Sequence, residues 1–148
     1  MNADQLQALL YREIPLSVAM QLQVHSVSPE QLSLYAPLLP NRNLHGTAFA
    51  GSLYSLATLA GWSLLTVHVA ERQWSGSVVL RHADIRYQRP VEGDLTATAL
   101  FADGDSVLAL AHELERRQRG RIVIPVTIAH DGKLAVSFNG EFVFHRHT

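Results

Sequence analysis

The chain has no cysteine, so disulfide bonds, thiolate metal sites and cysteine nucleophiles are all excluded. This absence is consistent with a reducing compartment, and we expect a cytoplasmic protein. No basic segment followed by an apolar run stands in the first residues, so no secretion signal is expected. An excess of charge of one sign is also lacking, since the formal net charge is −1. Without an overall field to attract nucleic acid or an anionic membrane, we expect neither as a partner.

Charged residues are absent from one long stretch in the middle of the chain. Residues 46–70 contain no Asp, Glu, Lys or Arg, and small residues mix there with large apolar ones. The length is that of a helix, and an apolar surface nearly all round predicts burial. A membrane span is the alternative by length. Hydroxyl-bearing residues interrupt the run and favour a buried central helix; they are Thr47, Ser52, Tyr54, Ser55, Thr58, Ser63 and Thr66.

The remaining composition is that of a folded protein. The chain has 148 residues, of which 47% are hydrophobic and 17% charged, which excludes a disordered chain. This length is enough for one core of useful size. We therefore expect a single domain over residues 1–148.

Periodicity predicts the other elements. Helical spacing indicates a helix over residues 3–12, ended by Pro15, and another from an Asp103 cap to Gln118, stopped by Gly120. Alternation of apolar and polar residues predicts strands at 20–27, 31–36, 77–89, 95–101, 121–130 and 133–144. Together these elements predict an α+β fold in which an antiparallel sheet of about six strands wraps a long central helix.

Turn signals suggest how the strands pair. Hairpins are expected between the first two strands, between 77–89 and its returning strand 95–101, and at Asp131-Gly132. Strict alternation along 77–89 places Val79, Ala83 and Ile85 on one face. Gly140 interrupts the last strand and suggests a bulge there.

Two segments carry a resemblance to the hotdog fold. One is Asn43-Leu-His45-Gly46 followed by Ala50-Gly51, and the other is residues 85–94, which end in Arg-Pro and a Gly-Asp turn. Residues 43–62 further resemble a narrower thioesterase-like group, also found at the C-terminus of some bacterial acetyltransferase-like fusions. Members of that group are regarded as acyl thioesterases. Part of the group is implicated in decarboxylating malonyl-acyl-carrier-protein to prime fatty-acid synthesis.

This resemblance implies a homodimer, or a dimer of dimers, with sheets joined edge to edge. It also implies that acyl thioesters of coenzyme A or acyl carrier protein lie in a tunnel at the subunit interface. The loop and the first turn of the long helix would present N–H groups to the thioester carbonyl, where an oxyanion needs donors already in place. No cofactor is implied. Eight histidines without a spaced Asp/Glu set do not indicate a metal site, so none is expected.

One departure from the family pattern concerns the carboxylate that activates water. Hydrolytic hotdog enzymes of the His-Gly-Gly type carry Asp or Glu two turns after the second Gly. Gly51 matches that Gly, so the acid position falls on Thr58 and the His position on Phe49. A threonine hydroxyl is a poor general base at neutral pH. Decarboxylation of a malonyl thioester needs no base, only donors for the enolate oxygen and a poorly solvated carboxylate.

The candidate catalytic residues are therefore Asn43, Gly51 and Thr58. The residues expected to bind substrate are His45, Gly46, Thr47, Phe49, Ser52, Tyr54, Arg86 and Arg89. Malonyl-thioester decarboxylation is the preferred function, acyl thioester hydrolysis the alternative, and a non-catalytic acyl-binding protein a third. Against these roles, Asn43 could simply hold its loop, and a helical hydroxyl such as that of Thr58 could bond the carbonyl four residues back.

Two further groups have structural and functional interpretations. His82 and Asp84 share a strand face, and an exposed face is favoured over a catalytic dyad because no nucleophile stands beside them. The charged run at residues 113–121 is by default a solvated helix end. The alternative is docking of an acidic carrier protein or of coenzyme A phosphates on its arginines, Arg116, Arg117 and Arg119, together with Arg89.

Overall fold

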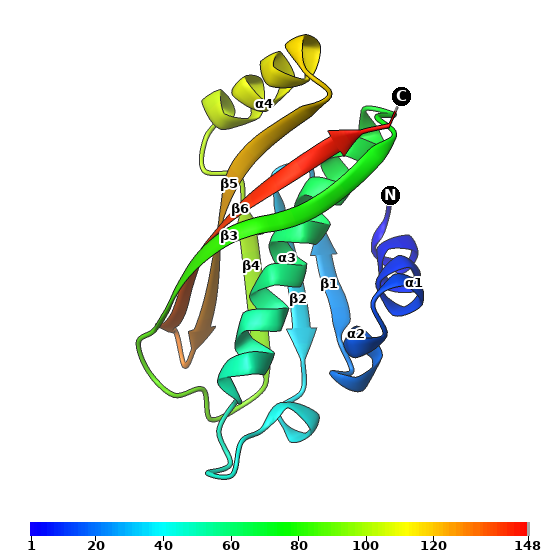
Figure 1. The fold of residues 1–148 in the computed structure, drawn as a ribbon. Coiled ribbons are helices and arrows are strands. Elements are labelled where there is room, and N and C mark those ends of the chain that lie inside the picture. Colours follow the sequence, from blue (N-terminus) through cyan, green and yellow to red (C-terminus); the bar gives the residue numbers. More distant parts are fainter. Residues whose placement is uncertain (148) are drawn as a thin grey trace.

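The computed structural model describes residues 1–147 and has the predicted α+β architecture, a six-stranded antiparallel sheet curved around one long helix (Figure 1). The elements in chain order are α1 (Ala3–Glu13), α2 (Pro15–Ala19), β1 (Gln23–Val27), β2 (Gln31–Ala36), a 3₁₀ turn (Leu39–Asn41), α3 (Ala50–Glu71), β3 (Gly76–Tyr87), β4 (Leu95–Leu100), α4 (Gly104–Arg116), β5 (Arg119–His130) and β6 (Lys133–Arg146). The strand order is β1-β2-β4-β5-β6-β3, which leaves β1 and β3 at the two edges.

The central helix α3 is the core of the fold. Leu56, Leu64 and Leu65 on this helix are at most 1% exposed, as are the phenylalanines of β6 that pack in the same core. The helix is long and apolar enough to cross a membrane, but 67% of its most apolar 18-residue window is buried inside the fold. The sheet supplies the apolar surroundings that the uncharged run of the sequence requires.

Glycines bring α3 and the strand β6 close together. A Cβ atom on Gly61 of α3 would lie 2.6 Å from the ring of Phe142, and one on Gly140 would lie 2.7 Å from the rings of Phe138 and Phe142. The predicted bulge at Gly140 is wrong, because this residue pairs in regular register with Ala83 and Ile124. Gly140 makes room for large neighbouring rings instead of marking an irregularity.

The edge strand β3 does contain an irregularity, at a place the sequence did not indicate. The register with β6 shifts between Leu80 and His82. The half-buried residues are consequently Val78 and Leu80 before the shift, and Ala83 and Ile85 after it. Strict alternation along this strand is therefore wrong, since one extra residue exchanges the faces of all residues beyond it.

The expected hairpin between β3 and β4 is also absent. Within the described residues, β3 pairs with β6 alone, and β4 lies between β2 and β5. Residues 88–94 instead pass across the start of α3, where the Ala48 N–H donates to the Val91 carbonyl at 2.8 Å. The β1–β2 and β5–β6 hairpins are confirmed; the Asp131-Gly132 turn has positive φ at both residues, as a tight hairpin turn requires.

Some predicted boundaries need correction. The first helix ends at Glu13, before Pro15, as predicted, and Pro15 also begins the short helix α2, which was not predicted; its fixed φ suits the first helical position. β1 starts at Gln23 and not at Met20, because Gln21 adopts a positive φ in the preceding turn. Gly120 belongs to β5, where a Cβ would lie 2.7 Å from Leu110 of α4.

Candidate functional site

The loop before α3 is built around the Asn43 side chain. Its Oδ1 accepts hydrogen bonds from the backbone N–H groups of His45 (2.9 Å) and Thr47 (3.2 Å), and its Nδ2 donates to Thr47 Oγ1 at 2.8 Å. The second amide hydrogen has only a 3.5 Å contact to the Ala48 carbonyl, at the limit of hydrogen-bond length. The loop-holding role considered for Asn43 is therefore present, and one donor is left weakly engaged.

The rest of the loop follows from its sequence. Gly46 has φ +79°, a conformation that favours glycine, and its N–H donates to the Asn43 carbonyl at 3.2 Å. The Thr47 carbonyl accepts a hydrogen bond from the Asn43 N–H at 2.7 Å, which closes the loop. His45 and Leu44 are exposed at the tip, with Leu44 90% exposed.

Asn41 ties this loop to the body of the protein, and the sequence did not indicate it. The side chain is 2% exposed, and its Nδ2 donates to the carbonyls of Met20 (2.9 Å) and Pro37 (2.8 Å). Its own carbonyl accepts from the Phe49 N–H at 2.8 Å. Asn41 therefore joins the α2–β1 turn, the end of β2 and the start of α3 at one point.

The first turn of α3 offers unpaired donors. Phe49 is the N-cap and no side chain caps the helix; the first intrahelical bond shown is from Leu53 N–H to the Phe49 carbonyl at 3.0 Å. Among the described residues, the N–H groups of Ala50, Gly51 and Ser52 have no acceptor. A Cβ on Gly51 would overlap the Phe49 ring, which folds back over the helix start. Three free N–H groups at a positive helix end can bind an anion or an oxyanion.

Residues 3–146 match the protein family described as "Putative thioesterase (yiiD_Cterm)". The chain belongs to this family. Because the match covers nearly the whole chain, the loop and helix start described above are part of the family's thioesterase-like domain. Family membership supports an enzyme of the thioesterase class.

Solved structures agree with this family and with the hotdog fold. A protein described as the "putative thioesterase from Shewanella oneidensis" is 33% identical, with 97% of this chain and 96% of that chain covered and a TM-score of 0.87. A protein of unknown function from Chlorobaculum tepidum is 28% identical, with 98% of this chain and 94% of that chain covered and a TM-score of 0.93. A probable thioesterase from Pseudomonas aeruginosa, 20% identical, covers 99% and 97% with a TM-score of 0.85 and shows the fold alone.

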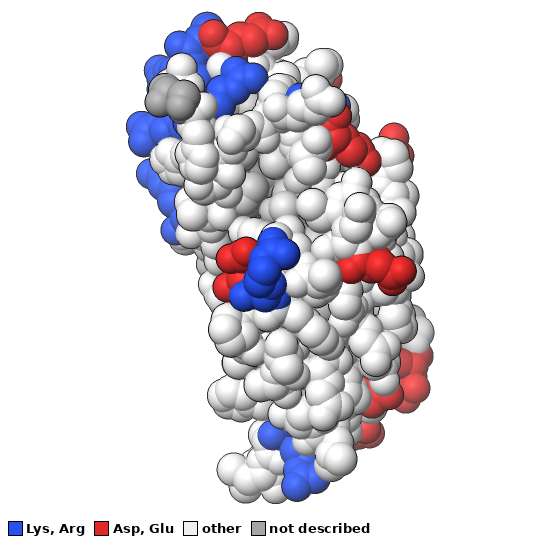
Figure 2. All heavy atoms as spheres, turned by 90° about the vertical axis from the view of Figure 1, so that its right-hand side faces the viewer, with Lys and Arg blue, Asp and Glu red and all other residues white. Residues whose placement is uncertain are grey.

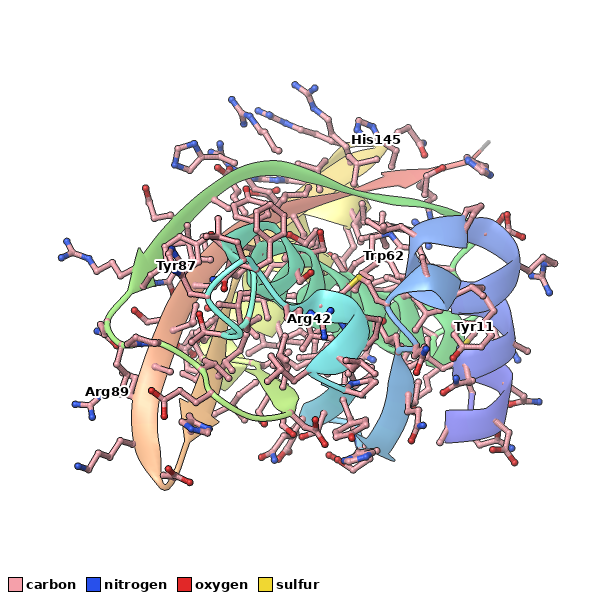
Figure 3. All side chains as sticks on the ribbon, turned by 90° about the horizontal axis from the view of Figure 1, so that it is seen from below. Tyr11, Arg42, Trp62, Tyr87, Arg89 and His145 are labelled. Atoms are coloured by element: carbon pink, nitrogen blue, oxygen red, sulfur yellow. The ribbon has the colours of Figure 1, made fainter. Side chains whose placement is uncertain are left out.

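In this thioesterase-family chain, Tyr87 joins the helix start although sequence reasoning did not select it. Its hydroxyl donates to the Ala50 carbonyl at 3.1 Å. Burial, and secondarily the neighbouring Tyr54, raises the pKa of Tyr87, so its hydroxyl stays protonated at neutral pH. Tyr54 in turn packs edge-on against Phe138, with 5.7 Å between ring centroids. Figure 3 shows Tyr87 beside the loop that carries Arg42. Tyr87 lies within the 85–94 segment that carries the hotdog resemblance, but that resemblance assigns it no role.

Hydroxyls along α3 are buried without partners. Thr58 Oγ1, Ser63 Oγ and Thr66 Oγ1 have no hydrogen-bond partner among the described residues. The expectation that the carbonyl four residues back satisfies Thr58 is therefore wrong for this structure. Thr58 lies seven residues beyond Gly51, about 10 Å further along the helix. A buried hydroxyl without a partner is available to a ligand.

Acidic side chains near the site are few. Asp94 is engaged by the Tyr35 hydroxyl (2.6 Å) and the Leu38 N–H (2.9 Å), and the Tyr35 hydrogen bond in particular holds the pKa of Asp94 below its usual value. Glu92 is exposed and follows Val91, the residue bonded to the loop at Ala48. No acid stands on α3 before its last residue. Thr58, the position where the resemblance to hydrolytic hotdog enzymes of the His-Gly-Gly type implies an acid, thus has no carboxylate.

Other candidates lie apart from the helix start. Arg86 and Arg89 are exposed, and Arg89 points outward from the molecule in Figure 3. His82 and Asp84 are 3.5 Å apart, but their side chains are 64% and 83% exposed, which agrees with a solvated strand face. Within the part of the chain that the structure describes, no group of three or more potential ligands could hold a metal ion.

The far end of α3 contains a buried histidine, His68, which is 5% exposed. Its Nδ1 lies 3.1 Å from Arg72 Nη1, and its ring meets the edge of Phe101 with 5.1 Å between centroids. Burial, and secondarily the Arg72 charge, lowers the pKa of His68 to about 4, so the imidazole is neutral at pH 7. This residue is more than four helical turns from the loop and takes no part in the candidate site.

Proposed function

We propose that this protein acts on short acyl thioesters at the start of α3 and decarboxylates a malonyl thioester to the acetyl thioester, which primes fatty-acid synthesis. One observation carries the proposal: the first turn of α3 has three unpaired N–H donors but no carboxylate to activate water. An enolate needs hydrogen-bond donors and no base, and this site provides them. Hydrolysis also needs a base to activate water, and the helix start provides none.

The chemistry balances without a cofactor. The bond between the malonyl carboxylate carbon and the α-carbon breaks, and carbon dioxide leaves. The electron pair of that bond moves onto the thioester as an enolate, whose negative charge rests on oxygen. A proton from water then reaches the α-carbon and gives the acetyl thioester. The protein must stabilise the enolate oxygen and leave the departing carboxylate poorly solvated.

Each candidate residue has a place in this scheme. The Gly51 N–H and its neighbours donate to the thioester oxygen, and the weakly held hydrogen of Asn43 Nδ2 turns toward the same oxygen. The Thr58 hydroxyl orients the substrate or, through water, the proton that reaches the α-carbon. Because α3 has no Lys or Arg in its first turns, no cationic side chain of this helix would form an ion pair with the departing carboxylate.

Substrate contacts would come from the surrounding loop and rings. His45, Gly46 and Thr47 form one wall, and Phe49, Ser52 and Tyr54 the helix wall. The arginines Arg86 and Arg89 would meet the phosphates of coenzyme A or the acidic surface of acyl carrier protein. The free edge of the 12-residue strand β3 supports a homodimer, or a dimer of dimers, that covers the exposed side of this site. We also propose that the protein is cytoplasmic.

Hydrolysis of acyl thioesters is the second candidate, because the family is a thioesterase family. The specific observation in its favour is Glu92, an exposed carboxylate one residue from Val91, which bonds the loop. In that case Glu92, or an acid from a partner subunit, would activate water. A third possibility, acyl binding without chemistry, would use the same walls.

Mass spectrometry of malonyl-acyl carrier protein incubated with the purified protein separates these functions. Decarboxylation leaves an acetyl-loaded carrier protein lighter by one carbon dioxide. Hydrolysis leaves the free carrier thiol and malonate, and a binding protein leaves the substrate unchanged. Parallel incubations with malonyl-coenzyme A identify the carrier. Free thiol as the first product, or no product with either carrier, would refute decarboxylation.

Asn43→Asp tests the donor role with little change to the loop. Aspartate keeps an oxygen for the His45 and Thr47 N–H groups but has no N–H₂ to give. We expect the variant to remain folded and to lose decarboxylation by about 100-fold, as for loss of one oxyanion donor. The matched control is Asn139→Ala on an exposed position of β6, which should keep full activity. Activity of Asn43→Asp within threefold of the wild type would exclude Asn43 as a donor.

A further inference from the structure

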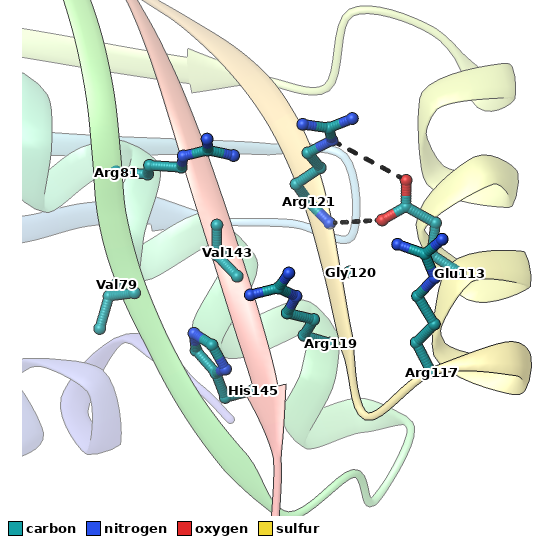
Figure 4. Close-up of a pocket in the computed structure, with 9 residues that line it drawn as sticks. All are labelled: Val79, Arg81, Glu113, Arg117, Arg119, Gly120, Arg121, Val143 and His145. Atoms are coloured by element: carbon teal, nitrogen blue, oxygen red, sulfur yellow. Dashed lines mark hydrogen bonds and ion pairs between the residues drawn. The ribbon is translucent and has the colours of Figure 1, made fainter.

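A pocket rich in arginine lies on the outer side of the sheet, at the end opposite to the loop site. It has a volume of about 470 Å³ and lies between α4 and the strands β5, β6 and β3 (Figure 4). The polar residues around it are Arg81, Arg117, Arg119, Arg121, His145 and Glu113. In Figure 1, α4 is at the top and the loop before α3 at the bottom. The 22 residues of α3 between them span about 33 Å, so this pocket is separate from the loop site of the same chain.

Strand register explains why the charges meet. Arg119 and Arg121 share the outer face of β5, because Gly120 between them faces inward against Leu110. Across the ladder, Arg119 stands opposite His145 and Arg121 stands opposite Val143. The segment at residues 116–121 therefore places three of its four arginines, Arg117, Arg119 and Arg121, around one hollow at the α4–β5 junction.

Positive charge in the pocket exceeds what the nearby carboxylates neutralise. Arg121 forms ion pairs with Glu113 (Nε to Oε1, 4.0 Å) and with Glu141 (3.7 Å). Arg81 also forms an ion pair with Glu141, at 3.7 Å. Within the described residues, Arg117 and Arg119 have no ion-pair partner. Two carboxylates thus stand against four guanidinium groups, although the whole chain carries a net charge of −1. Figure 2 shows the same uneven distribution, with Lys and Arg gathered along one upper edge of the molecule.

We propose that this pocket binds a small molecule with two phosphate groups, a diphosphate or a bisphosphate. Guanidinium groups bind phosphate oxygens in pairs, and two free arginines beside two partly neutralised ones suit two phosphates. The volume falls in the range of small-molecule sites, and a hollow of this size suits a compact ligand better than a flat protein surface. Val79 and Val143 add an apolar floor for the organic part of such a ligand. This inference does not depend on the proposed reaction.

Isothermal titration calorimetry with inorganic pyrophosphate tests the site, and adenosine 3′,5′-bisphosphate identifies the source of the ligand. We expect the wild-type protein to bind at least one of the two. Tighter binding of the adenosine compound points to the nucleotide end of coenzyme A, and binding of pyrophosphate as tight or tighter points to a free diphosphate. Both results support the site.

The variant is Arg117→Ala with Arg119→Ala, since both side chains are exposed and neither holds another residue in the described structure. Loss of two charged donors should weaken binding by about tenfold or more. Arg12→Ala on α1 is the matched control and should bind as the wild type does. Circular dichroism checks the fold of each variant.

Three results would overturn the proposal. They are no binding of either phosphate compound to the wild type, equal weakening in the Arg12 control, and unchanged binding in the double variant. Binding of an acidic carrier protein in the absence of phosphate binding would also count against it, since a protein-docking surface would then be the better explanation. Because binding is measured without turnover, failure here is distinct from failure of the proposed reaction.

Discussion

Replacement of Asn41 by alanine should loosen the loop that leads into the candidate site. The native amide donates to two carbonyls, those of Met20 and Pro37, from a position that is 2% exposed. Alanine removes both hydrogen bonds and leaves two carbonyl oxygens without that donor. Each lost bond with its buried acceptor is worth about 1–2 kcal/mol, so we expect the free energy of unfolding to fall by about 2–4 kcal/mol.

Urea unfolding measures this change. The midpoint should move to lower urea with an unchanged slope, because the surface exposed on unfolding is nearly the same. Asn41→Asp sharpens the test, since a carboxylate of similar size would face the two carbonyl oxygens and donate nothing. At pH 7 the free energy of unfolding of Asn41→Asp should fall at least as much as that of Asn41→Ala. At low pH the protonated carboxyl can donate one bond, so part of the difference from alanine should be recovered.

The exposed Asn139→Ala variant serves as the control and should change stability by less than about 0.5 kcal/mol. The reasoning would be refuted if Asn41→Ala were as stable as that control. It would also be refuted if Asn41→Asp were more stable than Asn41→Ala at pH 7. Either result would mean that the two hydrogen bonds of the Asn41 amide do not hold the loop.

Other perturbations test the packing and the titration of the core. Gly61→Ala puts a methyl group against the Phe142 ring and should destabilise the fold by about 1–3 kcal/mol in urea unfolding; an unchanged midpoint would contradict the close packing. Gly132→Ala, at φ +71°, should lower the melting temperature through about 1–2 kcal/mol of backbone strain, and an unchanged melting temperature would argue against this turn. Because the pKa of His68 is about 4 in the folded protein against 6.5 ordinarily, only the unfolded chain binds this proton between those values. Stability should therefore fall by up to about 3 kcal/mol as the pH drops from 6.5 to 4, and a His68→Gln variant with the same decline would refute this.

Local patterns were enough to predict most of the elements. The uncharged run became α3, the Asp131-Gly132 pair became a hairpin turn, and Asp103 caps α4 by accepting from the Ser106 N–H at 2.7 Å. These features depend on residues close together in the chain. The errors occurred where distant partners decide: the pairing of β3 with β6 and the shift at Leu80 both depend on which strand lies alongside.

The candidate site divides in the same way. The Asn43 loop and the Gly51 helix start were predicted because their residues are neighbours in sequence. Asn41 and Tyr87 were missed, since Met20, one of the two acceptors of Asn41, lies 21 residues away and Ala50, the acceptor of Tyr87, lies 37 residues away, and no local pattern marks such contacts. Whether residues 43–58 catalyse the proposed reaction stays a prediction.

By itself, the sequence determined that one helix without charges must be buried, that six strands of alternating character surround it, and that the base position of the helix holds threonine. Burial and chemistry of this kind follow from residue type. Only the tertiary structure decided that residues 88–94 cross the helix start and that Asn41 fastens the loop. It also decided that three arginines of the 116–121 segment meet Arg81 and His145 in one pocket; they are Arg117, Arg119 and Arg121. Those outcomes depend on strand order and register, which long-range packing selects from several arrangements that the same local patterns allow.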